Sequence, residues 1–299
     1  MLPDFAIGGA AKAGTTWLYA MLSANPQLFL SPVKEPRYFA VAEGQAPPFV
    51  GPGDEGLLRE LVSERRAYEG LYDGATDGQL LGEASPDYLY RAAVAAPRMA
   101  ELVPCARLVI ILRQPADRAF SNWSHHVRDG RETLPFMDAV RAEAERRAAG
   151  WAWGWSYVDR GFYGRQLRHF YECFPSEQIL VTLYDDLRED PCAFLTRVSG
   201  FLGVDAVVPQ RAEEPRYATL MPKSPAAARV RRTLQAVAPA VRALLPAQAR
   251  QRLRRAADRA TFEKPVMAPD ERDQLTRSYE PDIELVEELT GLDLARWRT

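Results

Sequence analysis

Residues 107–112 read Arg-Leu-Val-Ile-Ile-Leu, and this run constrains the fold more than any other segment. A strand that is apolar at every position after the first needs cover on both faces, which is typical of a parallel sheet between layers of helices. Three further short apolar runs and several helical patterns alternate along the chain, as in repeated strand–helix units. We therefore predict an α/β fold, a single domain with a central parallel sheet and helices on both faces. The predicted strands are residues 5–9, 80–83, 107–112 and 178–183, and helices are predicted over 15–24, over 115–126 and from Pro191.

The chain of 299 residues has no internal repeat, so the prediction assigns residues 1–299 to this one domain. Residues 204–264 are its variable part, because residues 224–260 have a helical pattern and hold nine arginines against one acid, Asp258. A solvated helix face is the default explanation of such a charge run. A cationic rim that attracts an acidic acceptor or a partner is the alternative. Residues 41–60 are rich in proline and glycine and are predicted to form a surface loop.

The overall charge excludes one broad class of partner. The formal net charge is −2, so the chain as a whole is not attracted to nucleic acid or to an anionic membrane. An anion-binding site must therefore be built locally. The sequence carries no indication of the oligomeric state.

Cysteine usage and the first residues predict the compartment. Cys105, Cys173 and Cys192 are widely spaced, and the three histidines make no metal-ligand spacing with them. We therefore expect buried thiols in a reducing cytosol rather than disulfides or a structural metal. Residues 1–5 lack the features of a signal peptide, and no segment approaches the ~20 apolar residues of a membrane span. The sequence predicts a soluble, cytoplasmic protein.

Residues 9–16, GAAKAGTT, join the first predicted strand to the first predicted helix. Their spacing matches the phosphate-binding loop G-x-x-x-x-G-K-[ST], except that Thr15 stands where the lysine is expected and Lys12 lies inside the loop. A loop of small residues at a helix N-terminus directs several N–H groups to one point, which suits an anion. The alternative is a tight turn that needs glycine only for its backbone. Lys12 and the two threonine hydroxyls favour the phosphate-binding interpretation.

The end of the 107–112 strand lacks the acid that Mg²⁺-dependent nucleotide hydrolases need there. Arg113 follows the strand instead, which indicates an additional phosphate to be bound and chemistry without a metal. Ser121 lies two helical turns further on, so its hydroxyl and Arg113 are expected to converge on a phosphate monoester. For Arg118, between them, a structural ion pair is the favoured role.

Several segments together resemble the sulfotransferase superfamily that uses 3′-phosphoadenosine 5′-phosphosulfate (PAPS). KAGTTWL and LRQPADRAFSNWSHH resemble its two PAPS-binding motifs, and KEPRYF is similar to the K-E-P-H-F-F element of bacterial members. GEASPDY resembles G-E-K-S/T-P-x-Y, and the likeness extends to the heparan sulfate sulfotransferases. The resemblance covers roughly residues 4–203, and a weaker similarity extends over residues 265–297. The four motifs occupy residues 12–18, 112–126, 34–39 and 82–88.

The resemblance implies a function and a set of site residues. It implies a sulfotransferase that moves a sulfuryl group from PAPS to a hydroxyl of a small-molecule or sugar acceptor, without a metal. Glu35 would be the general base and Lys12 would stabilise charge on the leaving phosphate. The residues implied to bind PAPS are Lys12, Ala13, Gly14, Thr15, Thr16, Trp17, Arg113, Ser121 and, in a late basic loop, Lys223. The sequence departs from the family pattern at Ala84, where a lysine is usual, and at Arg37, where a histidine is usual.

Other interpretations stay open at this point. His125 or His126 is a rival for the base, although a histidine on an apolar helix face is more often a hydrogen-bonded packing residue. Trp151, Trp153 and Trp155 would share one face of an extended segment and could stack on an acceptor ring, with core or lid packing favoured. A P-loop nucleotide kinase is the alternative enzyme, and a carbohydrate-binding or scaffold protein is a third class.

Overall fold

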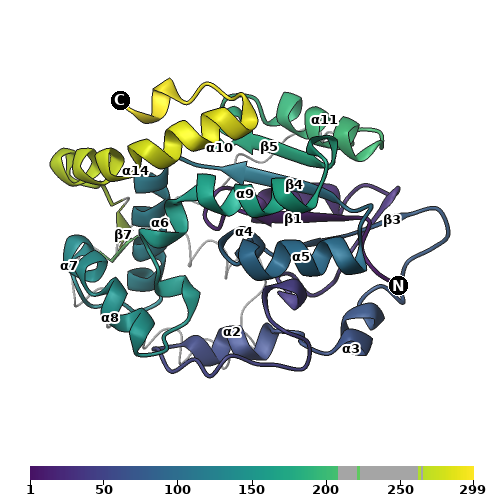
Figure 1. Cartoon of the computed structure of the whole chain (residues 1–299), viewed down its shortest axis with the longest axis horizontal. Helices are drawn as coiled ribbons and strands as arrows, with labels where there is room; N and C mark the ends of the chain where they lie inside the picture. Colours follow the sequence, from purple (N-terminus) through teal and green to yellow (C-terminus); the bar gives the residue numbers. More distant parts are fainter. Residues whose placement is uncertain (208–220, 223–261, 264) are drawn as a thin grey trace, which may run out of the picture.

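The structure of this protein is a computed structural model that describes residues 1–207, 221–222, 262–263 and 265–299. Five strands form one sheet in the order β2-β3-β1-β4-β5, and each neighbouring pair is parallel. The predicted parallel sheet is thus confirmed (Figure 1). The strands are β1 (Phe5–Gly9), β2 (Leu28–Leu30), β3 (Leu80–Ala84), β4 (Arg107–Leu112) and β5 (Ile179–Leu183).

Helices cover both faces because the chain leaves the centre of the sheet in two directions. From β1 it crosses to β2 at one edge, whereas from β3 it crosses to β4 and β5 at the other. Right-handed crossovers in opposite directions place their helices on opposite faces. On one face, α1 (Thr15–Leu22) meets α11 (Pro191–Leu202) through the rings of Trp17 and Phe194, whose centroids lie 6.4 Å apart. The other face carries α4 (Asp87–Tyr90), α5 (Ala92–Leu102) and α9 (Tyr163–Cys173), with α6 (Pro115–Arg128) and α14 (Pro269–Thr290) beside them (Figure 1).

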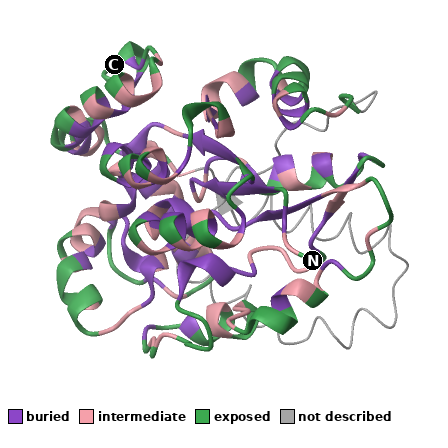
Figure 2. Ribbon diagram, turned by 45° about the vertical axis from the view of Figure 1, so that its right-hand side comes forward, coloured by how far each residue is buried: buried purple, intermediate pink, exposed green. Residues whose placement is uncertain are grey.

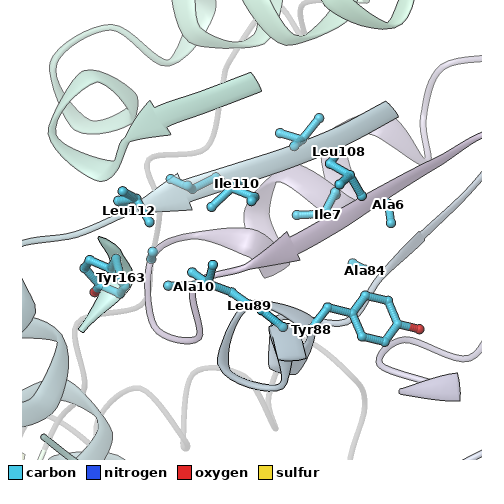
Figure 3. Close-up of a cluster of buried hydrophobic side chains, with 14 of the residues drawn as sticks. Ala6, Ile7, Ala10, Ala84, Tyr88, Leu89, Leu108, Ile110, Leu112 and Tyr163 are labelled. Carbon is cyan, nitrogen blue, oxygen red and sulfur yellow. The ribbon is translucent and has the colours of Figure 1, made fainter. Parts of the chain in front are cut away.

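The core follows the strands, which are almost continuously buried (Figure 2). Every residue from Leu108 to Leu112 has no exposed surface, as the apolar run predicts. Figure 3 shows side chains of β1 and β4 packed with Tyr88 and Leu89 of α4. A Cβ atom on Gly9 would lie 2.5 Å from the Cβ of Leu89, so this close approach of α4 requires glycine.

The remaining elements are short. They are α2 (Asp54–Glu60), α3 (Arg65–Gly70), α7 (Phe136–Arg141), α8 (Glu143–Ala148), α10 (Tyr184–Glu189), the antiparallel pair β6 (Met221–Pro222) and β7 (Phe262–Glu263), and five 3₁₀ turns, η1 (Tyr38–Ala40), η2 (Trp153–Trp155), η3 (Asp159–Gly161), η4 (Ser176–Gln178) and η5 (Ala295–Trp297). Among the described helices, none is long and apolar enough to cross a membrane.

Two predictions about the surface were wrong in part. Residues 41–60 are not all loop, because Gly53 adopts a left-handed conformation and α2 begins after it with Asp54 and Glu55 in its first turn. Acidic residues stabilise that end of a helix. The cysteines are free, but Cys105 and Cys192 are exposed and only Cys173 is partly covered. The predicted arginine-rich helices over residues 224–260 lie outside the described residues.

Candidate active site

A cavity of about 430 Å³ lies where the loop after β1 meets the end of β4. Strand β1 lies between β3 and β4, so this is the point at which the strand order reverses, and open α/β sheets bind ligands there. Among the described residues, the charged side chains that line the cavity are six cations and two acids. They are Lys12, Arg37, Arg113, Arg128, Arg131 and Arg160, with Glu35 and Asp87. The excess of cations suits a ligand with several negative charges.

The loop after β1 presents backbone donors to this cavity. Gly14 has φ 94°, and a Cβ atom there would lie 2.5 Å from Cδ2 of Leu187, so the turn requires glycine. The N–H groups of Gly14, Thr15 and Thr16 donate to no backbone oxygen of a described residue. Free N–H groups at the positive end of a helix are the arrangement with which proteins commonly bind anions.

Lys12 lies in the middle of that loop with its side chain in the cavity. Its backbone has φ 72°, a conformation that residues with a side chain seldom adopt. The pKa of Lys12 is lowered to about 8, chiefly by burial and then by the positive charges of Arg128 and Arg113. A bound anion would offset both effects and favour the charged ammonium.

Arg113 joins the loop to the end of β4. Its Nη1 donates a hydrogen bond of 3.0 Å to the backbone oxygen of Lys12, and its guanidinium lies 4.8 Å from the ring centroid of Tyr184. The hydroxyl of Tyr163 donates to the backbone oxygen of Arg113 at 2.9 Å. Ser121, on α6, lines the same cavity. The two residues predicted to share a phosphate therefore face one space.

Glu35 lies in the segment that follows β2, and its backbone is anchored on β3. Its N–H donates to the oxygen of Ala84 at 2.9 Å, and it has φ 64°. One carboxylate oxygen pairs with Lys34 Nζ, and the other lies 2.5 Å from Nη2 of Arg37. About a quarter of the Glu35 side chain is exposed (27%), so it remains accessible from the cavity.

Arg37, which pairs with Glu35, belongs to a row of buried charges that connects the residue before η1 to η3. Arg37 Nε lies 2.7 Å from Asp87 Oδ2, and Arg160 Nη2 lies 2.6 Å from Asp87 Oδ1. Burial alone would raise the pKa of Asp87, but Arg160 and Arg37 outweigh it and lower the pKa to about 2. Burial opposes the charge of Arg37 as well, yet the carboxylates of Asp87 and Glu35 hold its pKa above the usual range. The Arg37 guanidinium is therefore a fixed cation against Glu35.

The two histidines on α6 both line the cavity. His125 lies 3.6 Å from Asp129, and His126 Nδ1 lies 2.9 Å from the hydroxyl of Tyr157. Burial is the largest cause that lowers their pKa values, to about 3 for His125 and about 2 for His126. Neither imidazole is charged near neutral pH.

The tryptophan segment is packed as the favoured interpretation predicts, but it is not extended. Residues 153–155 form η2, because Trp155 N–H donates to Ala152 O in a tight turn. Trp153 and Trp155 are both buried; Trp153 also lines the cavity, and Trp155 packs against Trp151.

Arg118 is fully buried and donates to the backbone oxygen of Tyr157. The ion pair predicted for it is absent among the described residues.

The cavity brings together most of the residues predicted for the site. Lys12, Gly14, Thr15, Thr16, Glu35, Arg113 and Ser121 line it. Ala13 and Trp17 are buried and do not line it, and Lys223 lies outside the described residues. No role was predicted for Arg128, Arg131, Arg160 or Tyr184, which also line it. Within the described part of the chain, no group of three or more acids, histidines and cysteines could hold a metal.

Comparisons with known proteins agree with this geometry. A family model described as "Sulfotransferase family" matches residues 3–209. The human heparan sulfate glucosamine 3-O-sulfotransferase 3B1 is 27% identical over 208 residues, 69% of this chain and 47% of that protein. The human 3-O-sulfotransferase 6 is 30% identical over 207 residues, 69% of this chain and 54% of that protein. The chain thus spans about half the length of these curated relatives. A solved sulfotransferase from Alicyclobacillus acidocaldarius has a TM-score of 0.78 and 30% identity, with all of both chains covered.

Proposed function

Because the chain belongs to the sulfotransferase family, we propose that it transfers a sulfuryl group from PAPS to a hydroxyl of a small-molecule or carbohydrate acceptor. One observation supports this most strongly. The loop after β1, with Lys12, and the end of β4, with Arg113, line the same cavity as the carboxylate of Glu35. Two anion-binding elements and one proton acceptor around one space are what this transfer requires.

The donor would be held by the two ends of the cavity. Lys12, Thr15, Thr16 and the free loop N–H groups would bind the 5′-phosphosulfate, with Arg113 and Ser121 on the 3′-phosphate. Ala13 and Trp17 are buried and do not line the cavity. For Ala13, Trp17 and Lys223 a role in donor binding stays a prediction.

The transfer would be an in-line displacement, by analogy with phosphoryl transfer. The acceptor oxygen would form a bond to sulfur as the bond from sulfur to the 5′-phosphate oxygen breaks. Lys12 and the loop N–H groups would stabilise the charge that grows on the leaving phosphate. Glu35 would take the proton of the acceptor hydroxyl as general base. Lys34 and Arg37, which flank its two oxygens, would fix the carboxylate's position.

A kinase of the P-loop type fits less well, because such an enzyme needs an acid for Mg²⁺ after the second strand and Arg113 stands there. We include the whole chain in one domain, since α14 packs on α6 and α9 of the same layer. The free cysteines, two of them exposed, fit a reducing cytoplasm. The names of the relatives, heparan sulfate glucosamine 3-O-sulfotransferases, make sugars the first acceptors to test.

The proposal can be tested with PAPS that carries labelled sulfate. The purified protein would be incubated with a panel of hydroxylated metabolites and oligosaccharides, and labelled products would be separated and identified. Transfer of label to a hydroxyl, together with release of adenosine 3′,5′-bisphosphate, is expected. A protein that binds acceptors but has no affinity for the bisphosphate would be a binding protein instead.

A further inference from the structure

His126, which lines the cavity, is the first member of a buried series of hydrogen bonds that the proposed chemistry does not use. His126 Nδ1 lies 2.9 Å from the hydroxyl of Tyr157, and that hydroxyl lies 3.0 Å from Glu132 Oε2. Arg146 pairs with both oxygens of Glu132, with 2.5 Å between Nη1 and Oε2. The side chain of Glu132 is almost fully buried, with 1% exposed. These hydrogen bonds therefore connect a largely buried cation, Arg146, to an imidazole that lines the cavity.

The positions of the protons along this series of hydrogen bonds follow from the donor and acceptor capacity of each group. Burial opposes the charge of Glu132, but hydrogen bonds from Arg146 and the backbone of Leu134 keep its pKa below the usual value, so it accepts only. Tyr157 must then donate its single proton to Glu132. Toward His126, the Tyr157 oxygen can then act only as an acceptor. The Nδ1 atom of His126 must therefore donate, so it carries the proton of the imidazole.

His126 consequently presents a bare lone pair on Nε2. The imidazole is neutral, because burial and the nearby charges of Arg131 and Lys12 disfavour its protonation, and a neutral imidazole has one N–H. No described residue hydrogen-bonds to Nε2. The ring is held in place by Trp155, whose centroid lies 4.4 Å away. Gly154 is the neighbour of Nε2: a Cβ atom added to Gly154 would lie 3.7 Å from this nitrogen.

The other described polar side chains of the cavity are cations, carboxylates, the second imidazole and four hydroxyls, those of Thr15, Thr16, Ser121 and Tyr184. The hydroxyls can accept a hydrogen bond, but they rotate and so have no fixed direction. His125 Nε2 lies 3.6 Å from a carboxylate oxygen of Asp129. Lysine and arginine only donate hydrogen bonds. The carboxylates of Glu35 and Asp87 accept, but both are already paired with cations. A neutral acceptor with a fixed direction, such as Nε2, matches a neutral donor on the ligand.

We propose that His126 Nε2 accepts a hydrogen bond from a second hydroxyl of the acceptor substrate, one that does not react, and so selects polyhydroxylated acceptors over monohydric ones. This inference rests on the proposed function and adds the class of acceptor to it. His126 is then a specificity-determining residue, distinct from the general base. Tyr157 and Glu132 are positioning residues that fix which nitrogen carries the proton.

The tautomer can be measured without turnover. The chain has three histidines, so ¹⁵N-histidine NMR of the protein bound to adenosine 3′,5′-bisphosphate gives three imidazoles to assign. The signals of His126 are those that disappear in His126→Leu. The expected result is a neutral ring with the proton on Nδ1. In Tyr157→Phe the ring should no longer favour this tautomer, because the hydroxyl that accepts from Nδ1 is removed. A proton on Nε2, or a charged ring, would overturn the inference.

The selectivity is measured with labelled PAPS and two matched acceptors, trans-1,2-cyclohexanediol and its monomethyl ether, which lacks the second donor. One neutral hydrogen bond changes kcat/KM by roughly 2- to 10-fold. The diol-to-ether ratio should fall by that factor in both Tyr157→Phe and His126→Leu, and should not change in His169→Asn, a control on α9. An unchanged ratio in both variants overturns the inference, as does loss of kcat for both acceptors in His126→Leu, which would make His126 the base. Absence of transfer by the wild type would count against the proposed function, and the tautomer would still decide the inference.

Discussion

Nη1 of Arg113 lies 3.0 Å from the backbone oxygen of Lys12, so a side-chain hydrogen bond joins the end of β4 to the loop after β1. The same guanidinium lines the cavity in which the 3′-phosphate is expected. Charge-assisted hydrogen bonds contribute roughly 1.5–3 kcal/mol each, which corresponds to about 10- to 100-fold in affinity. Arg113→Met should weaken binding of adenosine 3′,5′-bisphosphate by that factor in calorimetry. The affinity for AMP should fall less.

The control for this loss is Arg168→Met, since Arg168 is exposed on α9 and its removal subtracts the same charge away from the cavity. Its affinity for the bisphosphate should match that of the wild type. Equal affinities of the wild-type protein for AMP and the bisphosphate would contradict the assignment of Arg113 and Ser121 to the 3′-phosphate.

Lys12 predicts a pH dependence of donor binding. Its pKa is about 8 in the free protein, lowered chiefly by burial, and a bound phosphate would raise it. Binding of the bisphosphate should therefore take up protons near pH 8 to 9, and the affinity should fall as the pH rises through this range. Calorimetry in two buffers of different ionisation enthalpy measures the uptake, and Lys12→Met should abolish it. Proton release on binding would have the wrong sign.

The same residue affects stability in the free protein. Between about pH 8 and the pKa of an unfolded lysine, the unfolded chain binds more protons at Lys12 than the folded one. The contribution of Lys12 to the free energy of unfolding therefore rises with pH in this window. Lys12→Met should flatten that rise in denaturant titrations.

Turnover is expected to need no divalent metal. Arg113 follows β4 at the position where a nucleotide hydrolase places an acid for Mg²⁺, and its positive charge can take over part of the ion's role. Sulfate transfer from PAPS should proceed at an unchanged rate in EDTA. Activity that EDTA removes and Mg²⁺ restores would show this expectation to be wrong.

The sheet could be predicted because each long strand contains a short apolar run of residues, which can be recognised in the sequence without knowing its neighbours. Strand β4 begins and ends where the apolar run does, at Arg107 and Leu112, since burial on both faces needs apolar residues throughout. Strand β2, Leu28–Leu30, was not predicted because three residues carry too little pattern. Helix α2 was not predicted because proline and glycine dominate the sequence before it.

The anion-binding residues and Glu35 could be predicted, because each lies in a motif of consecutive residues. The contacts behind Glu35 could not. Arg37, Asp87 and Arg160 meet across 50 and 73 positions of the chain, so their contact exists only once the sheet has formed. Asp87 belongs to a quoted motif, but its role depends on Arg37, which replaces the usual histidine. Glu35 has a left-handed backbone conformation, with φ 64°. Glutamate seldom adopts this conformation, so the residue type could not predict it.

Asp87 should be important for stability. It bridges the buried guanidiniums of Arg37 and Arg160, and loss of one partner of a buried ion pair typically costs about 3–5 kcal/mol. Asp87→Asn should lower the free energy of unfolding by that order in urea titrations. Asp138→Asn, at an exposed ion pair with Arg141, should cost less than about 1 kcal/mol. Similar costs for the two variants would contradict the role of Asp87.

The difference in the free energy of unfolding between the wild type and Asp87→Asn should depend on pH. The pKa of Asp87 is lowered to about 2 in the folded protein, below its ordinary value of 3.8. The stability contributed by the charged carboxylate is therefore present above about pH 4 and is lost as the pH falls toward 2. The wild type and Asp87→Asn should converge in stability across that interval.

Glu35 should be the residue whose charge matters for rate but not for donor binding. As a general base it contributes typically ~10²–10⁴ in rate, because it takes the proton of the acceptor hydroxyl. Glu35→Gln keeps the shape of the side chain but cannot accept that proton, so kcat should fall by this factor. Affinity for adenosine 3′,5′-bisphosphate and the melting temperature should change little, since the groups expected to bind the donor are other residues.

Glu60→Gln is the matched control for this experiment. Glu60 Oε2 lies 3.4 Å from Nη1 of Arg37, so the variant removes a carboxylate charge beside the same guanidinium while leaving Glu35 in place. Its kcat should stay close to the wild-type value, because the Glu60 side chain is 62% exposed and that ion pair is weak. Lys12→Ala should lose both rate and affinity for PAPS, which separates a donor ligand from a base. Near-normal turnover of Glu35→Gln, together with loss of turnover in His125→Ala, would transfer the role of base to the histidine.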